Sequence, residues 1–278
     1  MTEQPRFFQI EKDGPVIIWR FDNPPKNLWT TETGMEFARL ENEFYADPDL
    51  RVGIFTSAMP DVFIQHFDVS ILVNMGENLA KQAAEAPPPQ RRIGFRRDSK
   101  PIIAAINANL AGGGLERVMS FDFRFMSRTA RAAQGEVNVG ILPGGGGTQR
   151  MPRLIGIAKS LELQLLGRAV FADEAERIGL ITKACDPERL MPEALAFARE
   201  LATRPPLAVH HIRQCIFEGI DMPLEDGLAM ESELFRELLQ SGEAMERMRA
   251  YVATGQNARL ILDEEEDTDQ DKNSQAQS

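Results

Sequence analysis

The chain has 278 residues, 43% of them hydrophobic and 26% charged, which is typical of a globular protein with a sizeable core. Its net charge of -11 divides unevenly: residues 263–271 hold seven acids and Lys272 returns one positive charge, so this tail carries -6 and the rest -5. A mildly acidic body argues against a nucleic-acid partner, and no apolar run approaches the roughly 20 residues of a membrane span. The first residues lack a signal or transit peptide pattern, so we expect a cytoplasmic protein.

The composition predicts neither a metal site nor a redox site. Cys185 and Cys215 are the only cysteines, and their spacing matches no metal-binding or disulfide-exchange motif. Three histidines are too few for a multi-histidine metal centre. We therefore expect both cysteines to be small buried residues.

The first 60 residues predict the order strand, strand, helix, strand. Residues 7–12 and 15–21 alternate around an Asp-Gly turn and indicate a hairpin. A hydroxyl cap at Thr30 or Thr31 starts a helix whose apolar residues recur at helical spacing up to Asp47. Residues 51–57 then indicate a buried strand.

The next stretch leaves two interpretations open. Residues 62–76 begin as a strand and become helical, and a further helical run ends at three prolines, 87–89. Residues 90–100 then carry five basic side chains. They are either a solvated connection or a basic lining for an anionic ligand.

The strand and helix order recurs in the second half. Residues 101–108 and 121–127 indicate strands, with a short helix over 114–120 between them. Residues 148–166 predict one helix with Pro152 in its first turn and Gly167 at its C-terminal end. One more helix and strand follow, up to Cys185.

From Pro187 onward the pattern is wholly helical. Two apolar stripes at helical spacing mark this part: Leu190, Ala194, Phe197 and Leu201, then Leu224, Leu228, Phe235 and Leu238. We predict three regions: a mixed α/β core over 1–199, a helical region over 200–262 and an acidic disordered tail over 263–278.

Two glycine runs, 112–114 and 144–147, each follow an apolar segment and open a helical stretch. They predict tight turns whose backbone amides are free at a helix start, where negative charge is favoured. Glu116 lies just inside the first helix, and Glu136 precedes the second run. Two nearby carboxyl groups can move protons, so this combination predicts a catalytic site.

The segments KPIIAAINANLAGGGLE and VGILPGGGGTQRMPRLIG resemble the crotonase (enoyl-CoA hydratase/isomerase) superfamily, and the likeness covers roughly residues 6–256. The resemblance implies a spiral of strand-strand-helix repeats. It also implies a C-terminal helical region that mediates trimer formation, often in a hexamer of two trimers. The implied substrate is an acyl-CoA thioester, so coenzyme A is part of the substrate and no separate cofactor is expected.

The resemblance also implies roles for individual residues. The backbone amides of Phe67 and Gly113 match the pair that holds the thioester oxygen while negative charge develops on it. Glu116 matches the residue that positions and deprotonates a water, and Glu136 the residue that delivers a proton to C2. The amide of Gly144 matches one that helps to hold this water. For coenzyme A, the matching positions are Gln65, Asp68 and Val69 along the adenine and pantetheine path, with Lys26 near the phosphates.

The chain departs from the family pattern at four places, one of which is the lysine- and arginine-rich end of the last helix, which can reach coenzyme A in the family and is missing here after Tyr251. Gly135 replaces the usual proline before Glu136, which predicts a looser backbone there. Gln65, His66 and Phe67 replace small residues, and His66 is either a surface or structural residue or a donor of a hydrogen bond or proton. Arg117 would lower the pKa of a neighbouring carboxyl if it pointed inward.

The two glutamates favour an enoyl-CoA hydratase, which adds water across the C2=C3 bond. The alternatives are an isomerase that shifts the double bond and a catalytically silent homologue that binds coenzyme A or serves in assembly.

Overall fold

The computed structural model describes residues 4–81 and 99–254. Its core repeats the order strand, strand, helix, as the sequence predicts. The first three repeats are β1 (Phe8–Asp13), β2 (Val16–Phe21) and α1 (Thr31–Ala46); β3 (Val52–Ser57), β4 (Val62–Ile64) and α2 (Val69–Lys81); and β5 (Ile102–Ile106), β6 (Asn109–Ala111) and α3 (Gly113–Val118).

The fourth repeat is longer and carries two consecutive helices. It consists of β7 (Phe123–Ser127), β8 (Arg131–Ala133), the 3-10 helix η1 (Glu136–Val139), α4 (Gly147–Ile155) and α5 (Ile157–Leu166). The core then closes with β9 (Ala169–Phe171), α6 (Ala172–Arg177), β10 (Lys183–Cys185) and α7 (Leu190–Ala202).

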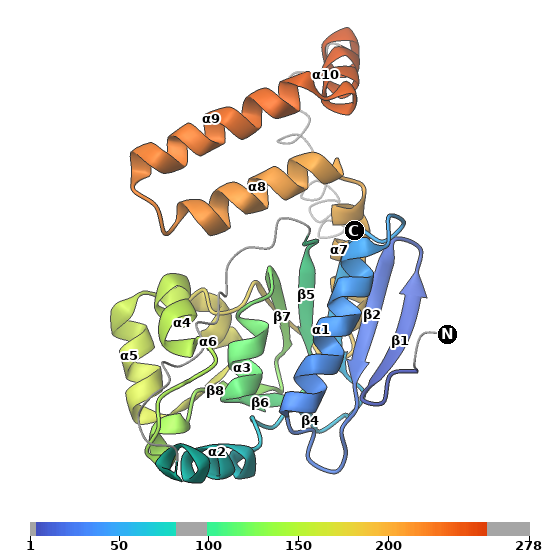
Figure 1. Cartoon of the computed structure of the whole chain (residues 1–278). Coiled ribbons are helices and arrows are strands. Elements are labelled where there is room, and N and C mark those ends of the chain that lie inside the picture. Colours follow the sequence, from blue (N-terminus) through green and yellow to red (C-terminus); the bar gives the residue numbers. More distant parts are fainter. Residues whose placement is uncertain (1–3, 82–98, 255–278) are drawn as a thin grey trace, which may run out of the picture. The chain divides into compact units, whose positions relative to one another are not determined.

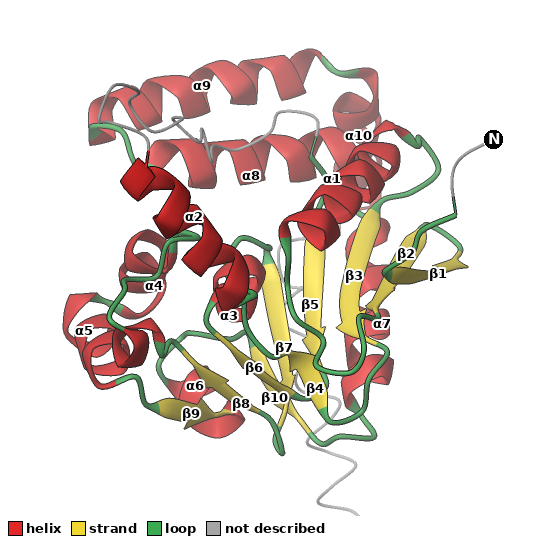
Figure 2. Ribbon diagram, turned by 60° about the horizontal axis from the view of Figure 1, so that its bottom comes forward, coloured by secondary structure: helices red, strands yellow, loops and turns green. Residues whose placement is uncertain are grey.

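The two strands of each later repeat enter different sheets. The large sheet has the order β1-β2-β3-β5-β7-β10, antiparallel in the β1/β2 hairpin and parallel elsewhere. The small sheet has the order β4-β6-β8-β9, in which β4, β6 and β8 are parallel. It lies across one end of the large sheet (Figure 1, Figure 2). Equivalent loops of successive repeats therefore meet at one place.

The strands β2, β3 and β5 of the large sheet are buried on both faces because a helix covers each face (Figure 1). On one face, Phe37 and Phe44 of α1 pack edge-on against Trp19, with ring centroids 5.4 and 5.2 Å apart. On the other face, Leu190 and Ala194 of α7 belong to a second apolar cluster with residues of β2, β3 and β5. Parallel strands need such cover on both faces.

The expected long helix over 148–166 is wrong, because the structure has two helices. Gly156 ends α4 with φ 77° and ψ 161°, and a residue with this positive φ cannot continue a right-handed helix. Pro152 lies inside α4 and not in its first turn, because the helix already begins at Gly147. Gly167 ends α5 in the left-handed conformation, as predicted. The strands β6, β8 and β9 have only three residues each and were not predicted.

Residue contacts divide the chain into two units, the first ending at Arg204 and the second beginning at Pro205. The second unit contains α8 (Pro206–Gly219), α9 (Leu224–Gln240) and α10 (Gly242–Thr254). The predicted stripe on α9 is on the surface of the chain, with Leu224 78% and Phe235 58% exposed. The predicted acidic tail and residues 90–98 of the basic segment lie outside the described residues.

Candidate active site

The C-terminal ends of β4, β6 and β8 meet because these parallel strands are neighbours in the small sheet. Parallel strands end at the same edge, where their loops come together. His66 and Phe67 follow β4, Gly112 and Gly113 follow β6, and Glu136 follows β8. Residues from three distant stretches of sequence are thus gathered at one edge.

The first glycine run is required by backbone geometry and by close approach. Gly112 has φ 52° and ψ -125°, a conformation that side chains oppose. A Cβ atom on Gly113 would lie 2.9 Å from Phe67 Cβ and 3.4 Å from Phe67 N. The start of α3 therefore lies directly against the loop after β4, which brings together the two residues predicted to supply amide donors.

The amides of Phe67 and Gly113 donate no hydrogen bond to any residue in 4–81 or 99–254. The direction of the Phe67 N–H is fixed, because His66 O in the same peptide group accepts a hydrogen bond from Trp29 N at 2.9 Å. In a trans peptide the N–H points opposite to the C=O, so it points away from Trp29. Two neighbouring amides without an acceptor among the described residues can hold an oxygen on which negative charge develops.

Glu116 is 4% exposed and is held by the second glycine run. Its Oε1 accepts hydrogen bonds from Gly145 N at 2.8 Å and Gly147 N at 2.7 Å. No described residue donates to its Oε2. One oxygen of this carboxylate is therefore anchored, and the other is available to a ligand.

Glu136 has the same arrangement with a different anchor. Its Oε1 accepts a hydrogen bond from Gln134 Nε2 at 2.8 Å, while its Oε2 is buried and meets no donor among the described residues. Its Oε1 would lie 3.0 Å from a Cβ atom on Gly112, which places the carboxyl beside the first glycine turn. The sequence analysis missed Gln134, which is 1% exposed, because a glutamine in a loop carries no signal by itself.

The surroundings of the two glutamates differ in charge. The pKa of Glu116 is raised above its ordinary value, because the effect of burial exceeds the lowering by the hydrogen bonds from Gly147 and Gly145 and by the charge of Arg150. Burial also raises the pKa of Glu136; its own backbone N–H, Gln134 and His66 lower it, and the negative charge of Glu116 raises it further. Glu116 thus has fixed donors for its ionised form, and its charge favours the protonated form of Glu136.

Of the four residues predicted to bind coenzyme A, three lie between the end of β4 and the start of α2, and the fourth, Lys26, is close enough for its charge to act on Asp68. Asp68 Oδ1 accepts hydrogen bonds from Ser70 N at 2.9 Å and Ser70 Oγ at 2.7 Å, so Asp68 caps α2. Lys26 is exposed and its charge acts on Asp68. Gln65 N donates to Asn27 O at 3.2 Å, and Val69 is 39% exposed at the start of α2.

His66, Arg117 and Gly144 have different surroundings. His66 Nδ1 lies 2.7 Å from Phe67 O, which fixes the ring beside the predicted amide pair. Arg117 points away from the glutamates and pairs with Glu41 at 2.7 Å, so the positive charge beside Glu116 comes from Arg150. Gly144 is exposed, and a Cβ atom on it would meet nothing within 4 Å.

Two further features lie apart from the glutamates. Burial raises the pKa of the Cys185 thiol to about 12, so this cysteine is a poor nucleophile.

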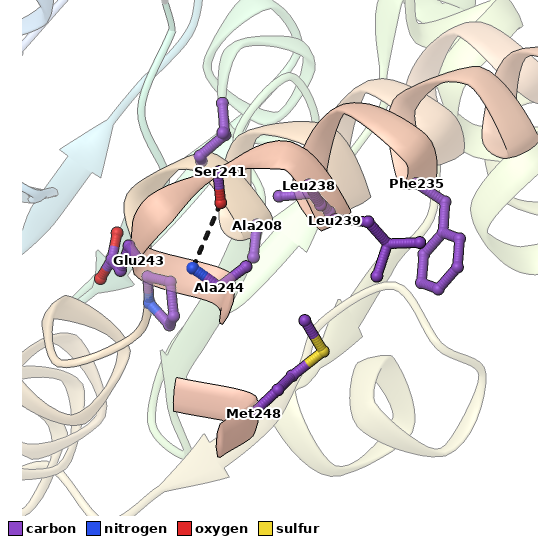
Figure 3. A pocket seen from close by; sticks show the side chains of 10 residues that line it. Ala208, Phe235, Leu238, Leu239, Ser241, Glu243, Ala244 and Met248 are labelled. Carbon is purple, nitrogen blue, oxygen red and sulfur yellow. Dashed lines mark hydrogen bonds between the residues drawn. The ribbon is translucent and has the colours of Figure 1, made fainter. Parts of the chain in front are cut away.

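A cavity of 190 Å³ lies within the second unit between α8, α9 and α10 (Figure 3). Its wall is almost wholly apolar, and its Ser241 Oγ accepts a hydrogen bond from Ala244 N at 3.2 Å as a helix cap. No described helix is long and apolar enough to cross a membrane.

Comparisons with known proteins identify the family of this chain. Residues 11–258 match the family model described as Enoyl-CoA hydratase/isomerase. The short-chain-enoyl-CoA hydratase of Clostridium acetobutylicum is 33% identical over 245 residues, covering 87% of this chain and 93% of that protein. The crotonyl-CoA hydratase of Syntrophomonas wolfei is 30% identical, covering 87% and 94%. An enoyl-CoA hydratase crystal structure from Geobacillus kaustophilus superposes with a TM-score of 0.81 at 29% identity, covering 91% and 97%. The chain therefore belongs to the enoyl-CoA hydratase/isomerase family.

Proposed function

We propose that this protein is an enoyl-CoA hydratase that adds water across the C2=C3 bond of a 2-enoyl-CoA thioester. The observation that carries this proposal is the matched pair of carboxyl groups, Glu116 and Glu136, each with one oxygen anchored and one without a described donor. Hydration needs one group to take a proton from water and another to deliver a proton to carbon. An isomerase needs one principal acid/base group and no bound water.

The environments of the glutamates support distinct roles. Glu116, with two amide donors and Arg150 nearby, is suited to remain ionised, bind the water and remove its proton. Glu136, next to that negative charge, is suited to carry the proton that goes to C2. A carboxyl group held by fixed donors and a second one beside its negative charge can divide the base and acid roles in this way.

The thioester carbonyl provides the other half of the mechanism. As the hydroxide adds at C3, negative charge develops on the carbonyl oxygen of the enolate-like state. The amides of Phe67 and Gly113 are the proposed donors to that oxygen, and one such donor contributes roughly 3 to 4 kcal/mol to transition-state stabilisation. No metal or separate cofactor takes part in the proposed steps.

The binding of coenzyme A is proposed along the loop after β4. Gln65, Asp68 and Val69 border this loop, and Lys26 contributes an exposed positive charge for a phosphate. The Gly144 amide is proposed as a further donor to the water, because it belongs to the turn that holds Glu116.

The test is the loss of absorbance of the conjugated thioester when pure protein is mixed with 2-enoyl-CoA substrates of increasing length and with aromatic groups. We expect turnover by wild type and a loss of at least a hundredfold in kcat for Glu116→Gln and for Glu136→Gln. Hydration that survives in both variants would contradict the proposal. Bond migration without water addition would indicate the isomerase, and binding without turnover the silent homologue.

We further propose that the protein assembles as a trimer or as a hexamer of two trimers. The support is a group of large apolar side chains that are exposed on α8 and α9 in the single chain: Ile212, Ile216, Leu224, Leu228 and Phe235. Exposed apolar patches on stable proteins mark interaction sites. Light scattering is expected to give three or six times the chain mass, and a monomer would refute the assembly. The cytoplasmic location stays a prediction.

A further inference from the structure

Arg150 lines the turn that holds Glu116. This residue lies on α4, where its half-buried guanidinium donates a hydrogen bond from Nη1 to Gly145 O at 2.8 Å. A Cβ atom on Gly146 would lie 2.3 Å from Nη1, so the guanidinium packs against the bare α-carbon of that glycine. Gly146 also has φ 107°. The side chain of Arg150 and the shape of the turn therefore depend on each other.

Within the described part of the chain, Arg150 forms no direct ion pair. No carboxylate in residues 4–81 or 99–254 lies within ion-pair distance of it, whereas its neighbour Arg117 pairs with Glu41 at 2.7 Å. Burial and the charge of Arg117 lower the pKa of Arg150, and the negative charge of Glu116 raises it. Burying a guanidinium without a paired carboxylate opposes folding, which indicates that its position serves another purpose.

We propose that Arg150 is a positioning residue for Glu116: it fixes the Gly145–Gly147 turn through Gly145 O, and its positive charge favours the carboxylate that takes a proton from water. This inference rests on the proposed hydration and deepens it. Arg150 itself touches neither the water nor the thioester. It acts through the turn and through its electric field.

The sign of the effect follows from the groups around Glu116. The charge of Arg150 on α4 favours the ionised form of Glu116, whereas Glu116 and Glu136 have like charges when ionised and therefore disfavour ionisation of both. His66, on the loop after β4, acts on Glu136. Removing the charge of Arg150 must therefore raise the pKa of Glu116. A general base must be ionised to act. As the pH is lowered, a variant without the Arg150 charge would therefore lose activity at a higher pH than wild type.

Two substitutions separate the charge from the geometry. Arg150→Gln removes the charge and, because its side chain is two atoms shorter, also the hydrogen bond to Gly145 O, so the acid limb of the kcat/KM profile is expected to move to higher pH. Arg150→Lys keeps the charge and loses the planar fork, so its acid limb is expected to stay in place while kcat falls. Arg153→Gln on the same helix, where Arg153 Nη1 bonds Gln149 O at 2.9 Å, is the control and is expected to change neither. An unshifted acid limb in Arg150→Gln, with reduced kcat, would leave a structural role only and overturn the proposal.

A second readout does not depend on activity. At pH 8, Glu116→Gln is expected to raise the melting temperature more in the Arg150→Gln background than in wild type, because the buried carboxylate has then lost its counter-charge. At pH 4, where the carboxyl is protonated, the two increases are expected to become equal. Equal increases at pH 8 would overturn the inference even if the protein proved not to hydrate enoyl thioesters. Absent hydration with this coupling present would instead refute the proposed function alone.

Discussion

Gly145→Ala tests whether kcat depends on the exact position of the Glu116 carboxylate. The new Cβ atom would lie 2.8 Å from Glu116 Oε2 and 3.1 Å from Cδ, where ordinary contact begins near 3.4 Å. The carboxylate is rigid, so relieving the clash by about 0.6 Å moves both oxygens. Oε1 would then leave the two amides that now hold it at 2.7 and 2.8 Å.

The cost of this shift is expected in kcat and not in stability. Misplacing a reacting group by about 1 Å can cost a hundredfold in rate, so we expect kcat to fall between about 10- and 100-fold, or about 1.4 to 2.7 kcal/mol. The displaced atom is the end of a flexible side chain, and alanine restricts the unfolded chain, so the net loss of stability should stay near 1 kcal/mol. This corresponds to a melting temperature lower by about 2 to 4 °C.

The control is Gly76→Ala on α2, the same type of substitution outside the proposed site. Its Cβ atom would meet nothing within 4 Å. We expect kcat within about twofold of wild type for the control. The assay is steady-state hydration with thermal unfolding of each variant. A kcat for Gly145→Ala within about threefold of wild type would refute the reasoning, because the carboxylate would then tolerate displacement.

Two further predictions concern Glu136 and the amide pair. The pKa of Glu136 is raised in the folded protein, so its ionised form destabilises the fold above that pKa, and this destabilisation disappears as the pH falls. Glu136→Gln should therefore have a melting temperature a few degrees above that of wild type at pH 8 and equal to it at pH 4. An equal difference at both pH values would contradict this. Gly113→Ala adds a Cβ atom 2.9 Å from Phe67 Cβ, which must spread the two amides and lower kcat/KM at least a hundredfold. The same control, Gly76→Ala, should remain active.

The sequence predicted the parts of the site that local geometry imposes. The turn at Gly112 and Gly113 needs residues without side chains, and that need is written in the sequence as a run of glycines. The hairpin and the helix beginning at Thr31 follow from alternation and capping, and the structure confirms both. The break at Gly156 was missed because one glycine inside a helical pattern can either be tolerated or end the helix.

The parts that depend on the packing of distant segments were not predictable. Gln134 lies only two residues from Glu136, but nothing in the sequence shows that its side chain turns toward that carboxyl. Arg150 acquires its role only because α4 is brought beside Glu116. The strands that do this, β6 and β8, have three residues each, too few to carry a period. The short strands therefore gave no warning of the sheet that assembles the site.

The glycine at 135 illustrates why a motif departure is weak evidence against function. A proline there would fix φ near -65°, whereas Gly135 has φ -105°, so this loop follows another path. The looser backbone expected without proline is restrained in a different way. The carbonyl of Glu136 accepts a hydrogen bond from Ile141 N at 3.2 Å, and its carboxyl is held by Gln134. The direction of a side chain depends on all of its contacts. The Glu136 carboxyl can therefore keep its position without the proline, because the hydrogen bonds from Gln134 and Ile141 restrain this loop instead.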